Sequence, residues 1–306
     1  MQPIRSVHVF LVACLVCVTA ACSSGGNSTS GSTPPAGGTT TIRITGSDTM
    51  VNLVQAWAEN YKKVHPDVSI QVAGGGSGVG IAGLIDGILD LAASSREIEP
   101  QELERATQKH GGVKPKEYTV ALDALSVYVH KNNPLDAIAL EDLAEIYGDG
   151  GKIEKWSQLG VKNTGCDSDT IVRVSRQNNS GTYVYFREAV LGTKREYKLG
   201  SIDQSGSKDV VMLVSRTPCA IGYSGMAYAT PDVKTVKLSK VKGQPPVAPS
   251  NETATNKTYP LARRLYFYSP GEPKPAVQQF LDWVMSPDGQ KIVKDIGFVP
   301  MPGSGN

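Results

Sequence analysis

Three times along this chain, a strand pattern ends in a turn of Gly, Ser and Thr residues and a helix pattern follows. These turns lie at residues 46–49 (GSDT), 76–78 (GSG) and 180–182 (SGT). Repetition of strand, turn and helix is typical of an α/β fold in which helices cover a largely parallel sheet. Because ligands gather at the carboxyl ends of strands in such sheets, we expect the three turns to contribute to one site.

The hydrophobic pattern gives the order of the other elements. Strands are predicted at 41–45, 68–72, 89–93, 171–175, 220–223 and 265–268. Helices are predicted at 50–64, 81–88, 99–110, 140–147, 180–190 and 276–285. The apolar stretch 120–130 (VALDALSVYVH) is long enough to cross between two lobes, and residues 243–256 are predicted to form a polar loop.

The composition is that of a globular protein without a strong global charge. The 306 residues are 40% hydrophobic and 20% charged, which is enough for two lobes with separate cores. Of 31 basic residues, only Arg5 lies in the first 21 residues, and the 29 acids all follow, so the remainder carries a formal charge of +1. We therefore expect no nucleic acid partner. An anionic ligand would have to be held by local dipoles.

The first 21 residues have the pattern of an export signal. Arg5 is followed by a 12-residue apolar run, residues 7–18, which is too short to span a bilayer. Thr19, Ala20 and Ala21 precede Cys22, and this arrangement resembles the bacterial lipobox, in which the cysteine is acylated. The alternative is an ordinary signal peptide cut near Ala21, which would release a soluble protein.

Residues 22–40 consist almost entirely of Ser, Gly, Thr, Pro, Asn and Ala and cannot build a core. They are predicted to form a flexible tether that spans on the order of 25 Å. Such a tether behind a lipidated Cys22 would hold a domain near a membrane. A disordered tail without a role is the alternative.

Two of the five cysteines, Cys166 and Cys219, follow the signal and the lipid site. An even pair in an oxidising compartment favours a disulfide, which would stabilise the fold by about 4 kcal/mol in the chain-entropy model. Two free buried thiols remain the alternative.

Small hydroxyl residues and glycine at a helix start suit an anion. Helix N-termini expose unpaired N–H groups and carry about half a positive charge, hydroxyls add donors, and glycine allows close approach. Arginine adds paired donors for an oxyanion. Arg176 lies four residues before Ser180, and Arg96 follows the third strand. The alternatives are simple helix caps and surface ion pairs.

Other chemistries have little support in the sequence. Residues 78–83 fit G-x-G-x-x-G after a strand, with Glu102 further on, but a dinucleotide site behind an export signal is not favoured. The four histidines show no metal-ligand spacing, and no nucleophile motif occurs. We therefore expect a binding protein that is not an enzyme and has no cofactor or metal.

The chain resembles the phosphate-binding proteins of phosphate-specific ABC importers, the PstS family. The resemblance rests on ITGSDTM (44–50), GGGSGVGIAGL (74–84), LDLAASSREI (89–98), SRQNNSGTYVYF (175–186), IGYSG (221–225), YPLARRLYFYS (259–269) and FLDWVMSPDGQKIV (280–293). It implies an α/β, two-lobe periplasmic-binding-protein clamshell in which each lobe is a mixed, mostly parallel sheet flanked by helices. Lobe one would comprise 41–122 plus 261–306, and lobe two 123–260.

The resemblance also implies phosphate-binding residues, by motif. These are Ser47, Thr49, Ser77, Arg176, Ser180, Gly181 and Thr182. The best-known branch has an aspartate after the third strand that accepts the proton of hydrogen phosphate and repels sulfate. This chain has Ser95 and Arg96 there, as another branch does, and both are expected to contact the phosphate. Asp48 is our candidate for the acceptor. The alternatives are that Asp48 only caps the following helix and that the Ser95 hydroxyl is the acceptor.

The sequence therefore predicts an exported protein that captures inorganic phosphate between two lobes and passes it to the membrane permease of an ABC importer. It would be a monomer, anchored at Cys22 on the periplasmic or cell-surface side of the cytoplasmic membrane. The alternatives are a binder of sulfate, molybdate or tungstate, an exported phosphatase or nucleotide-handling enzyme, and a structural lipoprotein that serves as an adhesin or sensor.

Overall fold

The computed structural model describes residues 39–303, so the predicted signal peptide and Cys22 lie outside the described residues. The strands are β1 (Thr40–Gly46), β2 (Val68–Ala73), β3 (Leu91–Ser94), β4 (Lys116–His130), β5 (Ala137–Ala139), β6 (Val172–Arg176), β7 (Ile202–Gln204), β8 (Ala220–Gly225), β9 (Val233–Ser239) and β10 (Ala262–Ser269). The α-helices are α1 (Val51–Val64), α2 (Ser77–Ile85), α3 (Pro100–Lys109), α4 (Leu140–Tyr147), α5 (Gly181–Phe186), α6 (Ser207–Arg216), α7 (Asn251–Thr255), α8 (Pro275–Met285) and α9 (Pro287–Ile296).

The sheet is mixed, with its antiparallel pairs in the middle. Strand order is β2-β1-β3-β10-β4-β8-β6-β7, and β9 joins β4 and β5 off this path. Strand β1 is parallel to β2 and β3, and β6 is parallel to β7 and β8. The parallel arrangement expected from the sequence therefore holds at both ends, whereas β10 and β4 are antiparallel to their neighbours.

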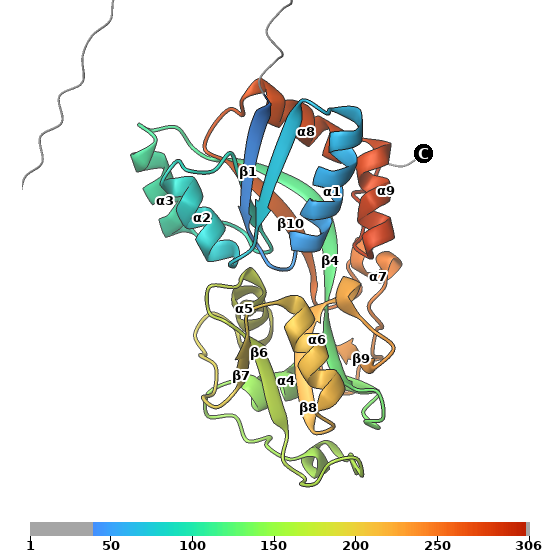
Figure 1. The fold of residues 1–306 in the computed structure, drawn as a ribbon. Helices are drawn as coiled ribbons and strands as arrows, with labels where there is room; N and C mark the ends of the chain where they lie inside the picture. Colours follow the sequence, from blue (N-terminus) through green and yellow to red (C-terminus); the bar gives the residue numbers. More distant parts are fainter. Residues whose placement is uncertain (1–38, 304–306) are drawn as a thin grey trace, which may run out of the picture. The chain divides into compact units, whose positions relative to one another are not determined.

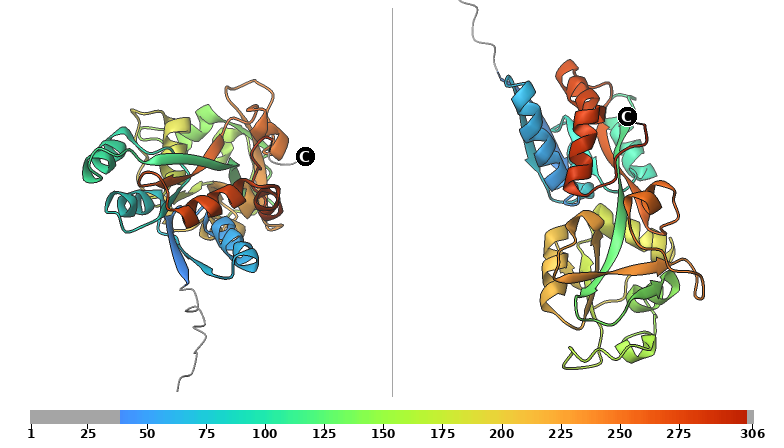
Figure 2. Two further views of the ribbon diagram at one scale, coloured as in Figure 1. Left: turned by 90° about the horizontal axis from the view of Figure 1, so that it is seen from above. Right: turned by 90° about the vertical axis from the view of Figure 1, so that its right-hand side faces the viewer.

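Two long central strands connect the two groups of helices. Figure 1 shows α1, α2, α3, α8 and α9 around one end of the sheet and α4, α5 and α6 around the other, with β4 and β10 running between them. Figure 2 shows the same arrangement from two further sides. Asp123 on β4 lies opposite Arg263 on β10, so this pair occupies the crossing region.

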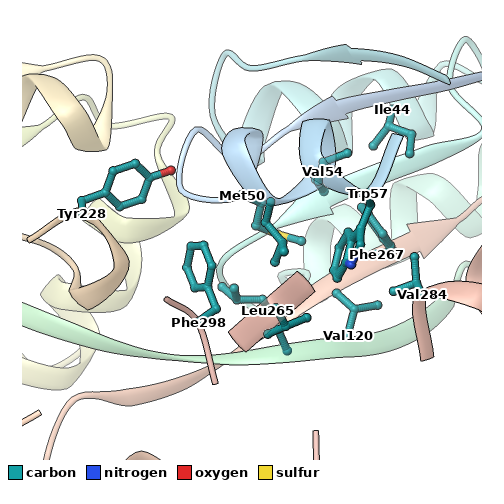
Figure 3. Packing of buried hydrophobic residues seen from close by; sticks show 14 of the residues in the cluster. Ile44, Met50, Val54, Trp57, Val120, Tyr228, Leu265, Phe267, Val284 and Phe298 are labelled. Carbon is teal, nitrogen blue, oxygen red and sulfur yellow. The ribbon is translucent and has the colours of Figure 1, made fainter. Parts of the chain in front are cut away.

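The core forms two main clusters of buried residues. One packs the sheet around β1 against α1, α8 and α9, includes Trp57, Phe267 and Phe280, and extends to α6. Figure 3 shows Trp57 beside Phe267 in this cluster. The Trp57 indole also donates to Gly289 O at 2.9 Å, which ties α1 to α9. The other cluster surrounds β4, β8 and α4 and includes Trp156 and Tyr223. Each large side chain buried in this way contributes about 1.5–3 kcal/mol.

Several elements differ from the sequence-based expectation. Helix α2 begins at Ser77, inside the glycine-rich segment predicted as a loop, and its Gly80 packs closely against the end of β1. The loop 243–256 contains α7, capped by Ser250. Helix α5 ends at Phe186 and continues as a π-helical turn to Leu191. The elements β5, β7, β9, α6 and α9 were not predicted. Strands β5 and β7 have only three residues each. Helices α6 and α9 do carry buried residues at helical spacing, such as Val210, Val211 and Val214 in α6, so the sequence held a signal for them.

The predicted disulfide between Cys166 and Cys219 is present, with the two Cα atoms 5.2 Å apart. It joins the loop before β6 to the residue that precedes β8. Within residues 39–303, none of the helices has the length and apolar character needed to cross a membrane.

Candidate functional site

Side chains from all three Gly/Ser/Thr turns meet in one cluster. Ser47 Oγ donates to Ser95 Oγ at 3.0 Å, and the Ser95 N–H donates to Ser77 Oγ at 3.1 Å. Thr49 Oγ1 lies 2.7 Å from Thr182 Oγ1. All five side chains are almost completely buried. We call these five residues the hydroxyl cluster.

Parallel pairing of β1 with β3 explains why Ser47 and Ser95 lie side by side. Both strands end at the same edge of the sheet, and the Ser47 N–H donates to Ala93 O at 2.8 Å. Gly46 has φ +142°, and an added Cβ would overlap Ala93 O, so only glycine fits at this turn. Helix α2 then begins at Ser77, directly after β2, and aims its N-terminus into the same region.

The third turn approaches from the other end of the sheet. The Gly78 N–H donates to Asn179 O at 3.0 Å, and Asn179 Nδ2 donates to Gly75 O at 2.9 Å. Ser180 caps α5 by accepting from the Thr182 N–H at 3.2 Å. Gly181 lies so close to the hydroxyl cluster that an added Cβ would overlap Ser77 Oγ. Asn179 was not predicted as a site residue.

Arg176 is completely buried at the end of β6. It donates to Gln204 O at 3.3 Å, Ser207 Oγ at 3.1 Å and Ser205 O at 2.7 Å, and its Nη2 lies 3.4 Å from Asp48 Oδ2. Burial lowers the pKa of the guanidinium and Asp48 raises it, yet an arginine remains protonated. Among residues 39–303, these contacts use four of its five N–H groups.

Both carboxylate oxygens of Asp48 have partners. Its Oδ1 accepts the Gly75 N–H at 2.8 Å, and its Oδ2 faces Arg176. The backbone of this turn is held by Tyr228, whose hydroxyl donates to Thr49 O at 2.7 Å and to Asp48 O at 3.2 Å. Figure 3 shows that hydroxyl pointing toward the turn before α1. Asp48 therefore connects the first turn to Arg176.

Arg96 lies apart from the hydroxyl cluster, although it follows Ser95 directly. Its guanidinium makes a two-pronged pair with Glu102, at 2.7 Å for both contacts, and donates to Glu97 O at 2.9 Å. It lines a cavity of about 530 Å³ that borders the cluster at Ser95. The pair with Arg96 also occupies the carboxylate of Glu102, the residue weighed as part of a dinucleotide site. The glycines of that G-x-G-x-x-G pattern, Gly78, Gly80 and Gly83, lie inside α2 instead of in a phosphate-binding turn.

Two charged residues at the site were missed by the sequence-based prediction. Arg263 on β10 donates from Nη2 to Thr182 Oγ1 at 3.0 Å and from Nη1 to Ser95 O at 3.2 Å. It also pairs with Asp123 Oδ2 through Nε at 3.0 Å and Nη2 at 2.8 Å. Asp123 is fully buried and Arg263 is 5% exposed. The Tyr185 ring lies 5.4 Å from the guanidinium carbon of Arg263.

One sequence signal pointed to this pair. Asp123 is the only charged residue in the apolar stretch 120–129, and a carboxylate in a buried strand requires a cation or several donors. Its partner could not be identified, because Arg263 and Arg264 are adjacent in the sequence and only the strand register decides between them.

The site combines many hydrogen-bond donors with two buried guanidinium groups. Each hydroxyl holds one donor and two acceptors, so hydroxyls that now pair with each other can turn toward an anion. Among residues 39–303, no group of three or more His, Cys, Asp or Glu residues could hold a metal ion. The arrangement is suited to gripping a small oxyanion from several sides.

Comparison with known proteins gives consistent matches. The family model described as the PBP superfamily domain matches residues 31–288. The phosphate-binding protein PstS of Pseudomonas aeruginosa is 38% identical over 268 residues, which cover 84% of this chain and 82% of that protein. The phosphate-binding protein PstS of Bacillus subtilis is 31% identical and covers 85% of this chain and 81% of its own length.

The fold has matches among crystal structures as well. A candidate phosphate ABC transporter substrate-binding protein from Clostridium perfringens, solved with bound phosphate, aligns with a TM-score of 0.74 and 30% identity. The alignment covers 85% of this chain and 99% of the other. The PstS structure from Borrelia burgdorferi aligns with a TM-score of 0.56 and 26% identity over 85% of this chain and 98% of the other.

Proposed function

Because this chain belongs to the PBP superfamily and, within it, to the PstS family of phosphate-binding proteins, we propose that it is a substrate-binding protein for inorganic phosphate. It captures the anion outside the cytoplasmic membrane and delivers it to the permease of an ABC importer. The observation that carries this proposal is the convergence of three Gly/Ser/Thr turns on one cluster beside buried Arg176 and Arg263.

In this proposal the anion takes the place of the contacts within the cluster. Ser47, Thr49, Ser77, Ser95 and Thr182 turn their hydroxyl hydrogens toward the phosphate oxygens. Arg176 supplies charge from β6, and Ser180 and Gly181 bring the start of α5 against the anion. Asp48 orients Arg176 and lies at the edge of the site. Arg96 contributes indirectly, since its pair with Glu102 fixes the loop that holds Ser95.

The number of donors is sufficient for tight binding. A hydrogen bond to a charged group contributes about 1.5–3 kcal/mol net. Micromolar affinity requires about 8 kcal/mol. The five hydroxyls and the Arg176 guanidinium exceed this sum, which leaves free energy to offset the ordering of the two sides of the site.

In this proposal residues 41–122 plus 261–306 are lobe one and residues 123–260 are lobe two. The chain crosses between them within β4 and again just before β10. The protein is exported, anchored through acylated Cys22 behind a tether at residues 22–40, and monomeric. Its role is binding without catalysis, which the many hydrogen-bond donors of the site favour.

A thermal-shift panel tests the function. The purified protein is heated with phosphate, sulfate, molybdate or a phosphomonoester at matched ionic strength, and phosphate is expected to raise the unfolding temperature most. A larger shift with sulfate or molybdate would assign it to another oxyanion. Release of phosphate from the monoester would identify a phosphatase, and no shift with any of them would favour a structural role.

A further inference from the structure

One buried carboxylate oxygen beside the hydroxyl cluster has no hydrogen-bond partner. Asp123 is fully buried, and both donors that reach it, Nε and Nη2 of Arg263, contact the same oxygen, Oδ2. Among residues 39–303, Asp123 Oδ1 accepts no hydrogen bond. An unsatisfied buried acceptor is costly and rare in folded proteins, so a role in binding would explain why it is kept.

One nitrogen atom, Arg263 Nη2, contacts both Asp123 and the hydroxyl cluster. Arg263 Nη2 lies 2.8 Å from Asp123 Oδ2 and 3.0 Å from Thr182 Oγ1. Thr182 Oγ1 in turn lies 2.7 Å from Thr49 Oγ1. On the other side, an added Cβ on Gly225 would stand 3.0 Å from both carboxylate oxygens, so that glycine leaves room for the carboxylate.

We propose that Asp123 Oδ1 accepts the hydrogen of a protonated oxyanion held at the Thr49–Thr182 end of the cluster. This contact makes Asp123 the residue that selects hydrogen phosphate over sulfate. The inference rests on the proposed function and names the chemical form of its ligand. Near neutral pH, hydrogen phosphate and hydrogen arsenate carry a proton to donate, whereas sulfate carries none.

Asp48 is the rival acceptor, and the geometry favours Asp123 over it. Both oxygens of Asp48 already have partners, the Gly75 N–H and Arg176, and its side chain is 21% exposed. Water can therefore reach Asp48 and donate one hydrogen bond to its carboxylate and another to a sulfate oxygen. Asp123 is shielded from solvent, so no water can enter between its oxygen and a sulfate oxygen. The repulsion between these two acceptors would therefore remain.

Arg263 determines what an amide would do at position 123. Because its two N–H groups point at one oxygen, an asparagine must keep its carbonyl oxygen on that side. The Asn NH₂ group then occupies the place of Oδ1 and offers a donor that sulfate can use. Asp123→Asn is therefore expected to convert sulfate repulsion into attraction.

The experiment is titration calorimetry of phosphate, arsenate and sulfate on the purified protein near neutral pH. Wild type is expected to bind phosphate and arsenate and to bind sulfate at least about 100-fold more weakly. Asp123→Asn should reduce the phosphate-to-sulfate affinity ratio by at least about 100-fold. Asp48→Asn should weaken all three anions together and leave that ratio within about threefold.

A second variant covers the case in which Asp123→Asn does not fold, since it leaves a buried arginine without its counter-charge. Asp123→Leu combined with Arg263→Met replaces the pair by apolar side chains and also removes the repelling carboxylate. Its affinity ratio should fall as well. A folded variant of either kind with the wild-type ratio overturns the inference, as does a loss of selectivity in Asp48→Asn. If wild type does not bind phosphate at all, the proposed function itself fails.

Discussion

Thr49 Oγ1 and Thr182 Oγ1 lie 2.7 Å apart, although 133 residues separate them in the sequence. The first belongs to the turn before α1 and the second to the first turn of α5. Thr182 Oγ1 also accepts from Arg263, so its own hydrogen, or that of Thr49, is available to a ligand. This contact joins two of the three recurring turns at the point where a bound anion would replace it.

Removing either hydroxyl should weaken phosphate binding by about tenfold. Thr49→Val and Thr182→Val keep the branched shape and delete one donor, which corresponds to about 1.5 kcal/mol. Thr182→Ser retains the hydroxyl and should bind within a few-fold of wild type. Phosphate titration of the three variants provides the measurement, and wild-type affinity in Thr182→Val would exclude this hydroxyl from the site.

Arg176→Ala should reduce phosphate affinity by about 100-fold. The change removes the buried charge that faces Asp48 and leaves the anion without that counter-charge. Arg176→Lys should recover only part of the affinity, because an ammonium cannot form the paired fork. Arg173→Ala on the same strand is the matched control, since Arg173 contacts Leu199 O instead of the hydroxyl cluster. Equal effects at positions 173 and 176 would contradict the assignment.

Gly181→Ala should reduce phosphate affinity by at least about tenfold. An added Cβ would overlap Ser77 Oγ and stand 2.8 Å from Ser95 Oγ, in the space between the cluster and α5. Gly78→Ala is the control, because its Cβ would meet Asn179 O at an ordinary 3.4 Å and alanine favours a helix. Titration together with thermal unfolding separates lost binding from lost folding. Unchanged binding by Gly181→Ala would show that the cluster tolerates the extra carbon.

Replacing both Cys166 and Cys219 by serine should lower the free energy of unfolding by up to about 4 kcal/mol. Phosphate affinity should stay unchanged, since neither cysteine is among the residues proposed to contact the ligand. Chemical unfolding of the two proteins gives the comparison. Alkylation of the native protein without reductant should modify neither thiol, and two modified thiols would exclude the bridge in the exported protein.

Cys22→Ser should move the protein from the membrane fraction to the soluble fraction. The thioether that would carry the lipid cannot form on serine, so the variant loses the predicted anchor. Fractionation of cells that express wild type or the variant provides the test. A wild-type protein found soluble, with a free N-terminus, would show that the signal is of the ordinary cleaved kind.

Local pattern was sufficient to predict most of the helices and strands and the three turns. The helix at 140–147 was predicted with the bounds that α4 has, and the strand 41–45 lies within β1. Their apolar spacing is set by residues only two to four positions apart, which a sequence displays directly. Elements such as β7 and β9 were missed because their pairing partners, rather than their own residues, make them strands.

The antiparallel centre of the sheet could not be predicted from strand patterns alone. Strand β10 comes late in the chain and returns between β3 and β4, so its direction depends on the whole chain path. That return brings Arg263 opposite Asp123 and places its guanidinium against Thr182 and Ser95. It also explains why Arg263, which lies in the segment YPLARRLYFYS (259–269), was not predicted as a site residue.

The sequence by itself determined the kind of site, because hydroxyls, glycines and helix starts are local features that sit a few residues apart. Only the tertiary structure decided which charges belong to it. Arg176 and Arg96 look equivalent in the sequence, each near a Ser-containing turn, yet one faces Asp48 and the other pairs with Glu102. Buried charges must be compensated by whichever groups the strand order brings beside them, and those groups lie from six to 140 residues away.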